Sequence, residues 1–161
     1  MLGVAMVVLA VAHNLLRAGF PPGVDTPTFL HMSWFTRETL RGDGGLVDPY
    51  WYGGFSLYTT YPPLSYGLVG LLAAVPGVGL VLTYKVVLLA AHAAIGAATY
   101  FLALQLANTR GWAALAALLA VLAYPALVAV GLWGWFSSVV ALPFALLAFG
   151  LLERAHTGGR R

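Results

Sequence analysis

Four of the five carboxylates in this chain lie close together, at Asp25, Glu38, Asp43 and Asp48. Asp25 stands in the segment GVDTPTFLHMSW, at residues 23–34, and is followed at once by Thr26 and Pro27. A positioned carboxylate can accept a proton as a general base. A carboxylate at the start of a helix can instead stabilise the helix dipole, by about 0.3–1 kcal/mol. Both roles are open for Asp25.

His31 lies one to two helical turns after Asp25, so the two side chains could face the same space. The alternative is a histidine that only lies at a membrane surface. Two ligands at this spacing do not form a metal motif, and Asp48 would be needed as the third. A site with a divalent metal and a site without a metal are therefore both open.

The segment from residue 42 to 67, GDGGLVDPYWYGGFSLYTTYPPLSYG, is dense in aromatic rings and glycine. One interpretation is an aromatic belt at a membrane surface, where such rings are enriched. The other is a groove in which rings stack on a sugar or a lipid head group, with glycine allowing close approach of the backbone. The rings concerned are Tyr50, Trp51, Tyr52, Phe55, Tyr58, Tyr61 and Tyr66.

These side chains stand in a strongly apolar chain, with 61% hydrophobic and 8% charged residues. A soluble domain of 161 residues needs far more polar side chains to cover its surface. The sequence therefore predicts an all-α integral membrane protein, located as a multi-pass protein in the cell membrane with lipid as its surroundings. The absence of cysteine excludes disulfides and thiolate catalysis, and no nucleic-acid pattern occurs.

A membrane-spanning helix needs about 20 mainly apolar residues, and four segments qualify. An external loop at 21–63 follows the first of them, and within it an amphipathic helix is predicted at 27–41. Thr26 is the expected N-cap and Pro27 the first helical residue. The face of this helix toward the membrane should carry Phe29, Met32, Phe35 and Leu40. The predicted spans are 1–20, 80–107, 112–132 and 136–152, with a basic tail at 153–161.

The segment 64–76 decides the topology. The apolar part before the turn at 76–79 gives roughly 18 Å of helix, which is too short to span a membrane. It is therefore predicted to dip into the membrane, which gives four spans with the N-terminus inside. The distribution of positive charge favours five spans with the N-terminus outside, because seven of the eight cations would then be inside and only Lys85 outside. Both topologies stay open.

The order of these motifs resembles the start of a GT-C-type membrane glycosyltransferase. The segments that carry the resemblance are GVDTPTFLHMSW and DPYWYGGFSLYTTYPPLSYGLVGLL, which follow an N-terminal span. Within that superfamily the chain is most similar to membrane proteins related to 6-pyruvoyl-tetrahydropterin synthase. The resemblance covers about residues 1–150 and implies that this chain is the N-terminal part of a larger fold.

The resemblance also implies roles for individual residues. The family's donor is a sugar linked to a polyprenyl phosphate, and an acid in the first external loop acts as base or metal ligand. Asp25 matches that acid, and Asp48 is the second candidate. The family often has two adjacent acids, whereas Thr26 follows Asp25, which leaves metal dependence open. The implied substrate-binding residues are His31, Arg37, Arg41, Trp51, Tyr52, Tyr61 and Lys85, with the cations placed near the lipid phosphate.

Two functions therefore remain from the sequence. The first is an inverting glycosyltransferase module that uses a lipid-linked sugar on the extracytoplasmic side and is incomplete on its own. The second is a non-catalytic multi-span subunit that packs against other membrane subunits, which the Ala- and Gly-rich spans would suit.

Overall fold

The computed structural model describes residues 2–17, 19–51, 54–60, 62–107, 109–123, 127 and 136–158, without the side chains of residues 14 and 60. Within these ranges the chain is all α-helical, with one isolated antiparallel bridge between Asp48 and Phe55. The seven helices are Leu2–Leu15 (α1), Thr26–Arg41 (α2), Leu57–Thr60 (α3), Leu64–Ala73 (α4), Leu80–Ala107 (α5), Arg110–Leu122 (α6) and Phe136–Gly158 (α8).

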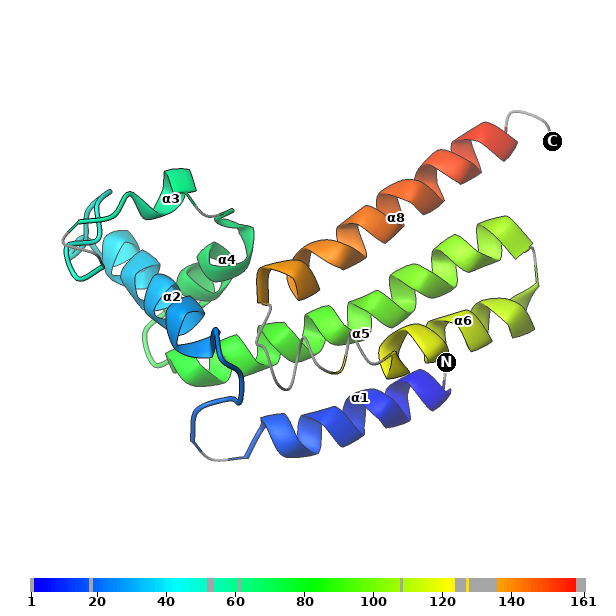
Figure 1. Cartoon of the computed structure of the whole chain (residues 1–161), viewed down its shortest axis with the longest axis horizontal. Coiled ribbons are helices and arrows are strands. Elements are labelled where there is room, and N and C mark those ends of the chain that lie inside the picture. The colour runs from blue at the N-terminus through cyan, green and yellow to red at the C-terminus, as the bar shows by residue number, and fades with distance from the viewer. Residues whose placement is uncertain are drawn as a thin grey trace.

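Helix α5 is the centre of the structure (Figure 1). Helix α8 packs along one side of it and runs in the same direction, while α1 and α6 lie on the other side and run back. Helices α2, α3 and α4, with their loops, gather at the N-terminal end of α5. We call this the loop-side end. All the candidate site residues between 25 and 61 that the structure describes belong to it.

Two helices, α5 with 28 residues and α8 with 23, are long and apolar enough to cross a membrane. Helix α5 has the bounds of the predicted span 80–107, whereas α8 contains the predicted span 136–152 and continues through six residues of the predicted basic tail. Helices α1, α4 and α6 are apolar but shorter. The prediction that the first span continues to residue 20 as one helix was wrong, because α1 ends at Leu15 and Gly19 has a φ of 95°. Of the predicted span 112–132, the part up to Leu122 is helical, and most of the rest lies outside the described residues.

Helix α6 turns small residues inward and large apolar residues outward. Its buried residues are Ala113, Ala117 and Val121. The exposed ones include Trp112, Leu115 and Leu119. Helix α4 shares this pattern in part, because four of its leucines are exposed, although Tyr66 and Val69 are buried beside Ser65, Gly70 and Ala73. A helix on the surface of a soluble protein has the opposite arrangement.

Glycines stand where the helices come closest. A Cβ added at Gly96 of α5 would lie 2.8 Å from Val4 of α1 and 2.9 Å from Val121 of α6. A Cβ added at Gly150 of α8 would lie 2.6 Å from the ring of Phe101 on α5. Real Cβ atoms essentially never come so close to another heavy atom. These positions therefore set the spacing of the helices around α5.

Helix α2 is bounded much as predicted, and three of the four residues predicted for its apolar face, Phe29, Met32 and Phe35, are buried. It begins at Thr26, with Asp25 in the N-cap position, and ends at Gly42, whose φ of 92° suits glycine. Thr26 is thus not the N-cap, and its hydroxyl donates instead to the carbonyl of Pro22 at 3.0 Å. Leu30 is buried and Leu40 is exposed, contrary to the predicted face. The reason is that α4 and α5 both pack on α2, which covers more of its circumference than one flat membrane face would.

The contact between α2 and α4 gives a first prediction. Gly70→Ala should lower the free energy of unfolding by about 1–3 kcal/mol through overpacking. The added Cβ would lie 2.7 Å from the Thr36 side chain and 2.9 Å from the Ser33 carbonyl oxygen. The matched control is Gly67→Ala in the same helix, where a Cβ meets nothing within 4 Å. Unfolding followed by circular dichroism in one detergent measures both, and equal stability of the two variants would contradict the close contact.

Candidate functional site

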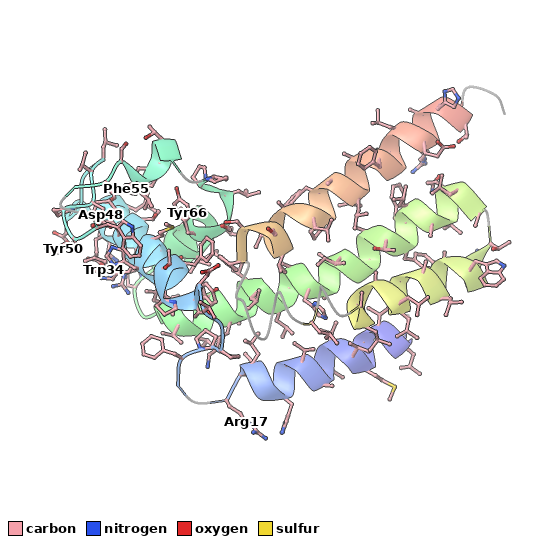
Figure 2. All side chains as sticks on the ribbon, in the orientation of Figure 1. Arg17, Trp34, Asp48, Tyr50, Phe55 and Tyr66 are labelled. Carbon is pink, nitrogen blue, oxygen red and sulfur yellow. The ribbon has the colours of Figure 1, made fainter. Side chains whose placement is uncertain are left out.

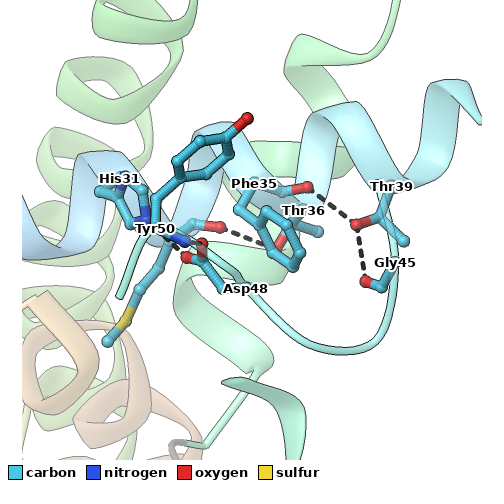
Figure 3. A network of polar contacts seen from close by, with 8 residues as sticks. His31, Phe35, Thr36, Thr39, Gly45, Asp48 and Tyr50 are labelled. Carbon is cyan, nitrogen blue, oxygen red and sulfur yellow. Dashed lines mark hydrogen bonds and ion pairs between the residues drawn. The ribbon is translucent and has the colours of Figure 1, made fainter. Parts of the chain in front are cut away.

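The centre of the loop-side end is a hydrogen-bonded pair of side chains, one from α2 and one from the loop that follows it. His31 Nε2 and Asp48 Oδ2 lie 2.5 Å apart (Figure 3). The second carboxylate oxygen, Oδ1, accepts a hydrogen bond from the backbone N–H of Tyr50 at 2.9 Å. The side chain of Asp48 is only 1% exposed, whereas that of His31 is 23% exposed. The carboxylate is therefore buried with both oxygens paired, and the imidazole stands between it and the solvent.

Local backbone geometry places Asp48. Its N–H donates to the carbonyl of Phe55 at 2.8 Å, and its carbonyl accepts from the N–H of Phe55 at 2.9 Å. Gly54 closes the turn between them with a φ of 126°, and its N–H donates to the carbonyl of Trp51 at 3.0 Å. The hydrogen bond that the Asp48 carboxylate accepts from the amide two residues later is the local pattern that Asp favours in turns. The loop therefore presents this carboxylate to α2 in one orientation.

Aromatic rings surround the imidazole of His31. The ring of Trp51 stacks on it, with centroids 5.1 Å apart and planes at 26°. Trp34 lies one turn further along α2, and the centroid of its ring is 5.5 Å from that of His31 and 5.9 Å from that of Tyr50. Figure 2 shows Trp34, Asp48 and Tyr50 together at this end of the molecule. The two tryptophan rings therefore limit the movement of the imidazole, and Asp48 forms a hydrogen bond with one of its nitrogens.

Three of the pockets formed by the described residues open around α2. The largest of these three, about 450 Å³, lies between the α1–α2 connection and α2, and we call it the linker pocket; its lining includes Phe20, Pro21, Pro27, Leu30, His31 and Trp34. A second, of about 330 Å³, has Trp34, Glu38, Asp43 and Tyr50 among its lining residues. A third, of about 320 Å³, is lined by Asp25, Phe29, Ser137 and Ser138.

Asp25 lies apart from the His31 pair. It stands at the N-terminus of α2 without a side-chain capping hydrogen bond. It lines the third pocket, next to the start of α8, whereas His31 lines the linker pocket. The two residues that the sequence could have placed in one space therefore face different pockets. Asp48, the second candidate acid, is the one that meets His31.

The three predicted phosphate-binding cations each bond within the chain. The Nε of Arg37 donates to Glu38 at 2.7 Å. Arg41 donates to the carbonyls of Ala73 and Ala74, at 3.2 and 3.4 Å, and so pairs carbonyls that the end of α4 leaves free. Lys85 is buried on α5, and its Nζ donates to the carbonyl of Arg17 at 2.5 Å. Their role toward a lipid phosphate stays a prediction.

The structure describes only one of the three remaining predicted site residues. Trp51 stacks on His31, but Tyr52 and Tyr61 lie outside the described residues. Within the described part of the chain, no three His, Cys, Asp or Glu side chains gather closely enough to hold a metal ion. Sequence reasoning missed Trp34 as a partner of His31. Trp34 lies three residues after His31 in a predicted helix, and residues at this spacing are neighbours on the helix surface, so the contact could have been predicted.

The buried carboxylate gives a second prediction. Asp48→Ala should leave the Nε2–H of His31 and the amide of Tyr50 without acceptors, which costs about 1–3 kcal/mol. Hydrogen exchange at the Tyr50 amide should then rise by about tenfold or more. Asp43→Ala, an exposed acid of the same loop, should leave that exchange unchanged. Unaltered exchange in Asp48→Ala would show that the carboxylate does not hold the loop.

Comparison of this chain with known proteins gives no match to a family model, to a curated protein or to a solved structure.

Proposed function

We propose that this chain is a multi-pass membrane protein with four spans formed around α1, α5, α6 and α8. The alternating directions of these helices support this arrangement, since they would cross out, in, out and in again (Figure 1). The outward leucines of α4 and α6 support it too, because lipid replaces water around them. All the loop-side elements would then lie on one side of the membrane.

Helix α4 favours four spans over five. Its ten residues extend only about 15 Å, half the thickness of the hydrocarbon core. It packs on α2 at the loop-side end, so its two ends stay on the same side of the bundle. Its exposed leucines would face lipid while Ser65 and Gly70 face protein. These features support the proposal that α4 dips into the membrane and returns to the same side.

Within this membrane protein, the function that we propose is that of a GT-C-like glycosyltransferase module. It would act on a polyprenyl-phosphate-linked sugar at the extracytoplasmic face, as the resemblance implies. The observation that carries the proposal is the paired imidazole and carboxylate among aromatic rings, at the end of an otherwise apolar bundle. Rings offer a stacking surface to a sugar, and the pair offers a group for proton transfer.

Asp25 and Arg41, at the two ends of α2, are the other residues to which we assign a role in this module, outside the pair of His31 and Asp48. Asp25 is a carboxylate without a capping bond that lines an open pocket with Ser137 and Ser138. Arg41 is the most exposed of the three candidate cations, since Arg37 is half-buried and Lys85 buried. A fixed cation stabilises a leaving phosphate as negative charge develops on it. Arg41 is therefore the cation that we assign to the lipid phosphate.

The proposed activity predicts the behaviour of one variant. The chain, reconstituted with the membrane fraction in which it is expressed, should transfer labelled sugar from a polyprenyl-phosphate donor to an endogenous acceptor. Asp25→Asn should reduce that transfer by about 100-fold or more, as expected for loss of a catalytic carboxylate. Glu153→Gln, at the far end of α8, is the matched control. Transfer that is the same in wild-type and Asp25→Asn would contradict the proposal.

The topology predicts a labelling pattern. The chain has no cysteine, so single cysteines can be introduced without background. With four spans, Asp43→Cys should react with an impermeant maleimide added outside intact cells, and His156→Cys should react only after permeabilisation. Both positions are exposed. Five spans with the N-terminus outside would place positions 43 and 156 on the cytoplasmic side, and neither cysteine would then react in intact cells.

A second candidate, a non-catalytic subunit of a larger membrane complex, rests on a different observation. Helices α6 and α8 expose several large aromatic side chains, among them Trp112, Phe144 and Phe149. Such side chains can pack against a neighbouring transmembrane helix as well as against lipid. Purification in a mild detergent separates the two cases, because a subunit should bring a defined membrane partner with it and a lone chain should not.

A further inference from the structure

We infer that His31 is the proton-accepting group of this site, that Asp48 positions it, and that the linker pocket holds an acceptor with a hydroxyl group and an apolar body. This inference rests on the proposed function and deepens it. The sequence alone gave the role of base to Asp25 or Asp48, and it gave His31 only a part in binding. The geometry assigns proton transfer to His31 instead, so the loss of transfer expected in Asp25→Asn reflects another role of that carboxylate in its own pocket.

The pair has the arrangement in which a carboxylate sets the state of an imidazole. Asp48 Oδ2 lies 2.5 Å from His31 Nε2, and a carboxylate oxygen can only accept there. The proton of neutral His31 therefore belongs on Nε2, and Nδ1 carries the lone pair. In catalytic triads a buried aspartate fixes the tautomer and orientation of a histidine base in the same manner, at the other ring nitrogen.

The second nitrogen of His31 is not used by the part of the chain that the structure describes. Among the described residues, no group forms a hydrogen bond to Nδ1, and the only hydrogen bond of this side chain is the one to Asp48. His92 on α5 provides a contrast. Neither of its ring nitrogens has a described partner, and it is completely buried, so nothing can reach it. His31 combines a free nitrogen with access from a pocket.

A merely structural pair would not need this access. A bond that only ties the loop to α2 is strongest when both partners are buried. Asp48 is buried, but the His31 side chain keeps 23% of its surface exposed and lines the linker pocket. Trp51 and Trp34 contact the ring without closing the pocket. The arrangement protects the carboxylate and leaves the imidazole available.

The pocket indicates the chemical class of the acceptor. Apart from His31, the side chains that form its walls are mainly apolar, including Phe20, Pro27 and Leu30. A free sugar, which has a hydroxyl on nearly every carbon, would lose more hydrogen bonds to water here than it could regain. An amphiphile with one hydroxyl, such as a glycerolipid, can bury its body and bring that hydroxyl to His31. We therefore assign a lipid alcohol as acceptor.

The proposed step balances in atoms and electrons. As the acceptor oxygen forms a bond to the anomeric carbon of the sugar, its proton moves to Nδ1 of His31. The bond between that carbon and the oxygen of the polyprenyl phosphate breaks, and its electron pair leaves with the phosphate. His31 becomes an imidazolium ion beside the Asp48 carboxylate, which stabilises the added charge. The proton then passes to solvent, and His31 returns to its neutral form.

The first test uses chemical rescue in the transfer assay. His31→Gln can still donate a hydrogen bond to Asp48 but has no basic nitrogen, so turnover should fall by about 100-fold or more while the KM for the donor changes little. His31→Ala leaves a space that free imidazole can enter, and added imidazole should raise the turnover of this variant at least about tenfold. Full turnover in His31→Gln, or no rescue of His31→Ala, would overturn the inference.

The second test does not depend on sugar transfer. Diethylpyrocarbonate acylates histidine at an accessible, unprotonated nitrogen, and mass spectrometry of the full chain in lipid nanodiscs reports each histidine separately. His31 should react far faster than the buried His92. Dioleoylglycerol added to phosphatidylcholine nanodiscs should slow the reaction at His31 at least about threefold by occupying the pocket, and leave the exposed His156 unaffected.

The two tests separate failure of the inference from failure of the proposed function. An unreactive His31 overturns the inference whether or not the chain transfers sugar. A reactive His31 that dioleoylglycerol does not protect overturns the assignment of a lipid alcohol. If His31 reacts and is protected but wild-type chain transfers no sugar, the pocket and its lipid alcohol stand and the glycosyltransferase proposal falls. Transfer that survives in His31→Gln leaves the enzyme and removes His31 as its base.

Discussion

The structure depends on helices that approach one another where side chains are absent. Gly96 lets α1 and α6 reach α5, Gly150 lets α8 reach it, and Gly70 lets α4 reach α2. Leucine burial provides little driving force when the surroundings are lipid, so helices associate through close van der Waals packing of small residues. In the membrane that we propose, this would explain why alanine and glycine are buried in α4 and α6 while leucine and tryptophan are exposed.

The same packing supports the candidate site. Helix α2, which carries His31, is pressed against α4 at Gly70. The hydroxyls of Ser65 on α4 and Ser137 on α8 lie 2.8 Å apart, and Arg41 of α2 donates to the last carbonyls of α4. These polar contacts join the loop-side helices to the apolar bundle. A side chain on α2 is therefore held on a rigid base, as a group that transfers protons must be.

Burial of one charge then determines the path of the loop. An isolated carboxylate inside a protein costs several kcal/mol, so Asp48 must find partners when the loop covers it. It finds the amide of Tyr50 and the imidazole of His31, and the loop can take only a path that brings all three together. The position of Trp51 follows from this path. Its ring stacks on His31 because the pairing of Asp48 with Phe55 turns this part of the loop toward α2.

The sequence predicts the local features of the site but not the contacts between distant residues. The turn at Asp48 has a local signal, because Asp before Pro favours a hydrogen bond to the amide two residues on. The partner of its other oxygen is 17 residues away, and no spacing rule reaches that far. The face of α2 was predicted from its own periodicity, which placed Leu40 inside and Leu30 outside. The two helices that pack on α2 reversed both, because burial is decided by neighbours and not by the helix alone.

The sequence by itself determined the all-α class, the two long apolar helices, the shortness of α4 and the limits of α2 to within a residue. These features follow from interactions within a few residues, such as apolar periodicity, proline at a helix start and glycine at its end. Only the tertiary structure decided that His31 meets Asp48 and that Asp25 faces another pocket. Contacts between distant segments depend on how closely helices can pack, and that distance is set by side chains from both partners at once.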